Sequence, residues 1–330
     1  MKVFLLVGLL VSMGTLWRTN SYAQACCSGG VPISSNLGLT NSSHRHWQFL
    51  ATYDLNVLND LVDNESNLND DSRKRTTHST LFEINYGLTE RIALTGLLSL
   101  VRQEREVTTF SNTEFTSAQG LSDAVLLAKY QLVTSRTGGQ YDLVLGAGPK
   151  LPIGATNSTN NSELLLPADM QAGTGSWDAV FWSYAARNAF IWPNFSVGLI
   201  STYRLTGTNS NYGGLPFQFG KELQSNLALS NRYTVRKLLL DALLTFRYRH
   251  VTADEVAQND VANTGGQWVY VVPGMQFNFS PAFGTRFSGD IPLYRKLVGT
   301  QLTTSFRFTF ALQYTIKPKP TVTVSPTLKP

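Results

Sequence analysis

SFRFTFALQYTI, the stretch from Ser305 to Ile316, decides the fold of this chain. Its apolar residues recur at every second position from Phe306 to Ile316, and polar residues such as Arg307 and Thr309 stand between them. Successive side chains of a β-strand point to opposite faces, so this segment predicts a strand with one apolar and one polar face. Such a strand suits the wall of a closed barrel in a bilayer, with its apolar face outward.

Similar segments recur along the chain, and we count about twelve of them, an even number typical of bacterial outer-membrane barrels. We expect strands at residues 46–58, 78–88, 91–105, 121–133, 140–153, 176–187, 194–205, 217–229, 235–249, 267–279, 283–291 and 305–316. The sequence therefore predicts an all-β fold, a transmembrane antiparallel up-and-down β-barrel. A soluble β-sandwich is the alternative architecture.

The connectors between these segments alternate between short and long. Short turns include GLTER at residues 87–91 and SNRYT at 230–234, whereas the long polar connectors span 59–77, 106–120, 155–174, 206–216, 252–266 and 292–300. A sandwich would not need this alternation. Short turns are periplasmic and long loops extracellular in bacterial barrels, so we expect both termini in the periplasm.

The N-terminus reads as a processing signal. Lys2 precedes the apolar run Val3–Met13, and the small-residue pattern at 23–25 is typical of a cleavage site. We expect a signal peptide at 1–25, a periplasmic segment at 26–45, the barrel at 46–316 and a flexible tail at 317–330. No later segment has the roughly 20 apolar residues of a transmembrane helix, so we expect insertion as strands into the outer membrane of a Gram-negative bacterium.

Composition agrees with this location. A hydrophobic content of 42% is too low for a helical membrane protein and suits strands that face lipid on one side only. The formal charge of +5 is scattered rather than clustered, which disfavours a nucleic-acid partner. The expected partners are outer-membrane lipid, lipopolysaccharide and a small-molecule solute. The oligomeric state stays open.

The two cysteines are adjacent, at Cys26 and Cys27, and no other cysteine can pair with them. Three interpretations remain. The pair is chemically idle in a flexible segment, or Cys26 carries a lipid, or both thiols bind a soft metal together with His44 and His46. The ligand types suit copper or zinc, but the spacing matches no closed motif.

No catalytic constellation stands out, so we predict neither an enzyme nor a cofactor. The GTGS segment at 173–176 lacks the GxSxG pattern of a nucleophile elbow. Charged residues instead mark the polar faces of the strands, where an outward position would cost about 2–4 kcal/mol near the membrane midplane. The candidate pore-lining residues are Glu83, Asp123, Lys129, Arg204, Asp241, Arg247, Arg286 and Arg307.

Two interpretations of these charges stay open. They form a lining that selects solutes, or a ladder of ion pairs that fills a narrow barrel. An arc formed by Arg204, Arg247 and Arg286 would favour anions.

Four local motifs resemble a known family. They are GLSDAVLLAKYQL at 120–132, PKLPIG at 149–154, LPADMQAGTGSWD at 166–178 and YRLTGTNSNY at 203–212. Together they resemble the meta-pathway phenol-degradation family of outer-membrane β-barrel transporters. The resemblance implies passive uptake of a small aromatic or otherwise hydrophobic solute.

The chain departs from that family at both ends. CCSGG and HRH near the N-terminus are outside the family pattern, and the chain continues past the last strand with KPKPTVTVSPTLKP. The alternative function is a non-transporting structural or adhesive barrel, whose loops and N-terminal segment bind metal or partner proteins.

Overall fold

A computed structural model describes residues 43–318, except 111, 135–139, 161 and 237. The expected signal peptide, Cys26, Cys27, the short connection SRTGG at 135–139 and most of the C-terminal tail lie outside the described residues. Within the part of the chain that is described, no helix is both long and apolar enough to cross a membrane.

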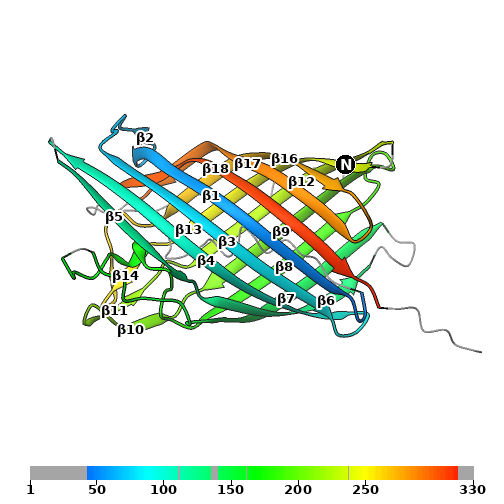
Figure 1. Ribbon diagram of the computed structural model, residues 1–330, viewed down its shortest axis with the longest axis horizontal. Helices are drawn as coiled ribbons and strands as arrows, with labels where there is room; N and C mark the ends of the chain where they lie inside the picture. Colours follow the sequence, from blue (N-terminus) through cyan, green and yellow to red (C-terminus); the bar gives the residue numbers. More distant parts are fainter. Residues whose placement is uncertain (1–42, 111, 135–139, 161, 237, 319–330) are drawn as a thin grey trace, which may run out of the picture.

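The wall of the structure is a closed antiparallel barrel of 12 strands (Figure 1), which confirms the predicted fold class. Its strands, in order around the wall, are β1 (Trp47–Asp63), β3 (Arg73–Gly87), β4 (Ile92–Thr109), β5 (Asn112–Leu121) continued by β6 (Ala124–Val133), β7 (Tyr141–Leu151), β8 (Asp178–Arg187), β9 (Phe195–Leu205), β12 (Glu222–Val235), β13 (Leu238–Val251), β16 (Gly266–Asn278), β17 (Phe283–Leu297) and β18 (Thr300–Ile316). Pairing of β1 with β18 closes the barrel.

The two ends of the barrel differ. Trp47 pairs with Ile316, so the described chain enters and leaves the wall at one end, which also carries the short strand connections and is called here the turn end. The opposite, loop end carries β2 (Ser66–Asn67) and a separate four-stranded sheet (Figure 1). That sheet consists of β10 (Thr208–Tyr212), β11 (Leu215–Gln218), β14 (Glu255–Val256) and β15 (Asn259–Asp260). One 3-10 turn, η3 (Ala168–Met170), follows β7 in the chain.

Several strands are longer than the sequence indicates. The expected loop 106–120 is mostly the β4–β5 hairpin, and most of 292–300 belongs to β17 and β18. Neighbouring strands continue to satisfy each other's backbone N–H and C=O groups beyond the alternating apolar segments, so polar composition does not end them. The predicted turn SNRYT was wrong for the same reason. It lies within β12 and pairs with β13, and the chain reverses at Arg236, which has a φ of 56°.

The alternation of side chains separates an apolar outside from a mixed inside. On β18, Phe306, Leu312 and Tyr314 are exposed on the outer surface, while Arg307 is buried on the inner face. Buried apolar side chains of β3 to β8 form one cluster within the barrel: Leu81, Leu97, Val101, Val125, Leu127, Val144, Val180 and Trp182. One side of the interior therefore contains an apolar cluster, next to the buried ion pair of Lys129 and Glu83.

Residue parity on β13 yields a test of the outer surface. Leu244 is exposed on the outside, and the next residue, Thr245, is half-buried. Leu244→Arg should destabilise the barrel in lipid by about 2–4 kcal/mol, because it places a charge on the apolar surface. Thr245→Arg should be tolerated far better. Urea unfolding in lipid vesicles, followed by the mobility shift of the unheated protein in electrophoresis, measures the difference. Equal losses would contradict the assigned faces.

Candidate functional site

The interior of the barrel narrows from the turn end toward its middle. Near the turn end, a hollow of about 450 Å³ is lined by Tyr184, Asn188, Ser196, Arg232 and Asp241, among others. Midway, a cavity of only about 40 Å³ lies among Arg75, Arg247, Arg249, Arg307 and their polar neighbours. The first volume suits a small molecule, whereas the second suits little more than water.

The candidate lining residues are mostly held in ion pairs. The pairs are Glu83 with Lys129 (3.7 Å), Asp123 with Lys150 (2.6 Å), Arg204 with Glu222 (3.3 Å), Asp241 with Arg232 (2.6 Å), Arg247 with Asp290, and Arg307 with Asp54 (2.7 Å). Arg286 instead donates to the Gln276 side chain, at 2.8 and 3.1 Å. Arg204, Arg247 and Arg286 thus have three different partners, Glu222, Asp290 and Gln276, and the basic arc stays a prediction. A role of these charges in selectivity stays a prediction.

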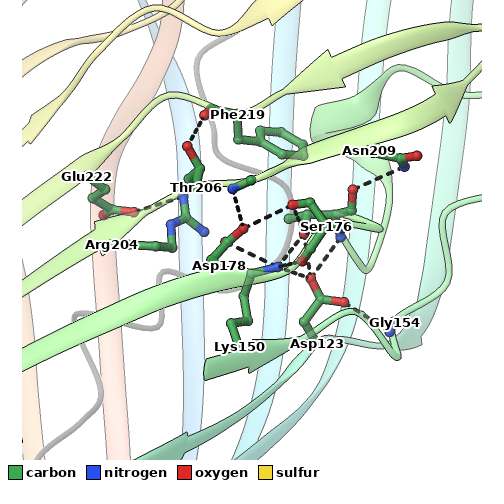
Figure 2. Close-up of polar contacts among 12 residues, drawn as sticks. Asp123, Lys150, Gly154, Ser176, Asp178, Arg204, Thr206, Asn209, Phe219 and Glu222 are labelled. Carbon is green, nitrogen blue, oxygen red and sulfur yellow. Dashed lines mark hydrogen bonds and ion pairs between the residues drawn. The ribbon is translucent and has the colours of Figure 1, made fainter. Parts of the chain in front are cut away.

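The four family-like motifs meet at one buried lysine near the loop end (Figure 2). The Lys150 ammonium donates to Asp123 Oδ2 (2.6 Å), to the Thr174 hydroxyl and to the Ser176 carbonyl (2.9 Å), and it lies 3.2 Å from Asp178 Oδ2. These five residues are called the Lys150 clasp. An ammonium has three N–H donors, and all three have partners here. The clasp is therefore a structural junction rather than an empty ligand site.

The clasp fixes both ends of the connection between β7 and β8, residues 152–177, which we call the inner loop. Asp123 accepts the backbone N–H of Gly154 (3.0 Å) and of Thr174 (2.9 Å). Gly154 and Gly173 then touch backbone to backbone, since a Cβ on Gly173 would lie 2.5 Å from the Gly154 carbonyl carbon. Only glycine fits this contact, which forms a narrow neck.

The chain after β9 completes the junction. Asp178 accepts the Gly207 N–H at 3.0 Å, and the Asn209 amide donates to the Thr174 carbonyl at 3.2 Å (Figure 2). The GTN segment of the fourth motif is thereby tied to the second and third motifs. The sequence showed these motifs separately and gave no sign that they meet.

Beyond its neck, the inner loop folds into the barrel. Arg75 Nη1 donates to Asp169 Oδ2 at 2.8 Å, and the Gln103 amide donates to the Gln171 carbonyl at 3.3 Å. Met170 of η3 is fully buried against Ala118 and Leu166. The long polar connector expected at 155–174 therefore folds inward and fills part of the interior.

Sequence reasoning missed Arg75 and Asp169. The second strand was expected to begin at His78, which left Arg75 in a connector, although β3 begins at Arg73. One signal was available, because the apolar run LLLPADM in the middle of a polar loop indicates burial.

His44 and His46, the described residues of the predicted metal site, each contact a backbone carbonyl group. The Nδ1 atom of His44 lies 3.0 Å from the Leu88 carbonyl, and that of His46 lies 3.0 Å from the His44 carbonyl. No group of three or more His, Cys, Asp or Glu residues is placed to hold a metal within the described ranges. Cys26 and Cys27 lie outside those ranges, so the metal interpretation is untested.

One carboxyl group at the loop end, that of Asp254, has an unusually high pKa. Asp254 lies after β13, where its Oδ1 accepts the Gly220 N–H at 2.7 Å and its own N–H donates to the Thr264 hydroxyl at 2.9 Å. Burial raises the pKa of Asp254 from 3.8 to about 6, and the Gly220 hydrogen bond offsets only part of this effect. The folded loop therefore favours the protonated carboxyl group.

The clasp predicts a large cost for removing its cation. Lys150→Met would leave Asp123 and Asp178 buried without the ammonium, which should destabilise the protein by about 3–5 kcal/mol. Lys221→Met is the matched control, because Lys221 is exposed at the same end of the barrel. Urea unfolding in detergent, followed by tryptophan fluorescence, compares the two variants. Equal stability of both would show that the clasp contributes nothing.

Asp254 predicts a pH dependence of the loop end. Because the folded pKa of about 6 exceeds the ordinary 3.8, the stabilisation is complete below pH 3.8 and is lost as pH rises through about 6. The change amounts to at most about 3 kcal/mol. Hydrogen exchange of residues 252–265, corrected for intrinsic rates, should show protection falling between pH 4 and 7. Asp254→Asn should flatten this profile, and a wild-type profile that rises with pH would refute the assignment.

Comparisons with known proteins establish the architecture. No protein family and no curated protein matches the sequence. Among solved structures, the COG4313 outer membrane channel from Pseudomonas putida F1 superposes with a TM-score of 0.66 at 12% identity, over 83% of this chain and 97% of that one. The β domain of the Bordetella autotransporter BrkA gives a TM-score of 0.45 at 13% identity, over 83% of this chain and 100% of that one. The CymD monoaromatic hydrocarbon channel gives 0.37 at 9% identity, over 84% and 90%. At 12% identity the likeness to the first of these structures shows the fold alone, which is a closed antiparallel β-barrel.

Proposed function

We propose that this protein is an outer-membrane channel of a Gram-negative bacterium that admits a small solute by passive diffusion. The observation that carries the proposal is the inner loop. A barrel with a purely structural role can be filled by the side chains of its own wall. Here the loop end is filled by a separate segment that enters through the Gly154–Gly173 neck, and its inner part can move without breaking any pairing between wall strands.

The location follows from the outer surface. Phe82 and Leu126, like Phe306 and Leu312, are large apolar side chains exposed on different strands around the outside. Lipid is the environment that stabilises such a surface on a closed barrel. The short connections at the turn end support a periplasmic position for that end and for both termini of the barrel.

The interior supports a partly apolar solute. The cluster that includes Leu97, Leu127 and Trp182 places apolar surface on one side of the interior, beside the Lys129–Glu83 ion pair. Arg247 and Arg307 with their carboxylate partners make the other side charged. A molecule with an apolar body and one polar group is complementary to both sides. This agrees with the aromatic or hydrophobic solute implied by the family resemblance.

The rival function is a non-transporting structural or adhesive barrel. The matched ion pairs and the 40 Å³ cavity at the middle of the interior are what that function would require. The two functions differ in one respect that can be measured, because a channel passes solute as the wild-type protein, whereas a structural barrel passes none.

Replacing residues 155–172 by a short Gly/Ser linker between Gly154 and Gly173 tests the proposal. The linker keeps the neck and the Lys150 clasp but removes Asp169 and Met170 from the interior, so single-channel conductance in planar bilayers should rise several-fold. Shortening the β14–β15 hairpin, which lies in the separate loop-end sheet, is the control and should leave conductance unchanged. If neither the wild type nor the linker variant conducts although both are folded, the structural role is correct.

A further inference from the structure

A pocket at the loop end of the interior gathers three arginines around one carboxylate. Arg73 and Arg75 come from β3 and Arg105 from β4, and Arg75 lies directly opposite Arg105 in the strand register. The carboxylate is that of Asp169, on the inner loop. The remaining wall is apolar and consists mainly of Leu58, Leu61 and Leu302, which pack together as one cluster. We call this site the arginine pocket.

The positive charge of the arginine pocket is not matched. Asp169 is the single acid among its lining residues, and neither Arg73 nor Arg105 has a described acid within ion-pair distance. Asp70, outside the pocket, is the acid whose charge interacts with Arg73. The Nε atom of Arg75 is buried without a hydrogen-bond partner. Arg75 is buried, and its Nη atoms donate to Asp169 and Gln103, so its Nε atom is the group that attracts a further acceptor. Arg105 is half-buried and Arg73 exposed beside it, and both add positive charge.

The Arg75–Asp169 ion pair joins the barrel wall to the inner loop, unlike the other ion pairs of the interior. Every other ion pair on the described inner face joins two positions of the barrel wall, as Arg307–Asp54 and Arg204–Glu222 do. Those pairs persist whatever the inner loop does. Arg75 alone loses its carboxylate when the inner loop moves, and three arginines then face the opening together.

The pocket is filled while Asp169 occupies it. The space left beside the carboxylate is about 20 Å³, which holds about one water molecule. A molecule larger than water can therefore enter the arginine pocket only by replacing Asp169. The Lys150 clasp includes none of the pocket residues, so this exchange leaves the neck of the inner loop intact.

We propose that the arginine pocket recognises the carboxylate of a small, partly apolar solute, and that Asp169 takes the place of this carboxylate in the closed channel. The solute carboxylate binds Arg75 with Arg73 and Arg105 beside it, and the apolar body lies against Leu58, Leu61 and Leu302. Release of Asp169 frees the inner part of the loop. The inference rests on the proposed channel function for the passage of solute, but the binding step stands independently of flux.

Binding of benzoate to the full-length protein in detergent tests the site by titration calorimetry. Asp169→Asn removes the competing carboxylate and should bind benzoate at least tenfold more tightly than the wild type. Adding Arg75→Gln to that variant should abolish the binding. Adding Arg91→Gln instead, an exposed arginine at the turn end, should leave it unchanged. Heat-modifiable electrophoretic mobility confirms that each variant is folded.

Three further ligands separate the components of recognition. Benzyl alcohol has the apolar body without the charge, whereas acetate and inorganic phosphate have the charge without the body, and all three should bind the Asp169→Asn variant much more weakly than benzoate. Equal binding of acetate or phosphate would refute the apolar contact, and equal binding of benzyl alcohol would refute the arginine contact. No gain from Asp169→Asn, or binding that survives Arg75→Gln, would overturn the site. Binding without conductance would refute the channel function and leave the site intact.

Discussion

The rest of the structure depends on the pairing of β1 with β18. A chain that crosses lipid as strands must satisfy every backbone N–H and C=O group within its own wall, and only a closed barrel leaves no unpaired edge. Closure then fixes which residues face inward, because side chains alternate strictly along each strand. Arg307 and Asp54 are brought together by this pairing, from opposite ends of the sequence, and each compensates the charge of the other.

Closure also creates an interior that must be filled. The wall supplies most of the filling through pairs such as Arg247–Asp290 and through the apolar cluster around Trp182. The inner loop supplies the rest, and it is attached in two different ways. Its neck is held by a fully satisfied buried lysine, whereas its inner part is held by hydrogen bonds, by the burial of Met170 and by the Arg75–Asp169 ion pair. None of these inner contacts is a pairing between wall strands, so displacement of the inner part would leave the wall closed.

The architecture could be read from the sequence because its determinants are local. The period of two, the even strand count and the alternation of connectors can each be recognised without knowledge of tertiary contacts. Ser305–Ile316 alone nearly defines a wall strand. The extents of the strands could not be read in this way. Arg73 and Arg75 are polar residues in a strand, stabilised by backbone pairing with β4 rather than by an apolar face. The motifs around Asp123, Lys150 and Asp178 could be recognised in the sequence. The contacts between them could not, because these contacts depend on which strands are neighbours and on a loop that turns inward.

The Gly154–Gly173 neck has a consequence for how such a protein diversifies. Since the neck and the clasp define the two ends of the inner loop, the sequence between them is a cassette that can change in length and chemistry while every wall strand keeps its register. Descendants of one ancestral barrel could in this way acquire new cargo by exchanging a single segment. Selection for a stable barrel wall and selection for a particular solute would then act on separate segments of the same gene.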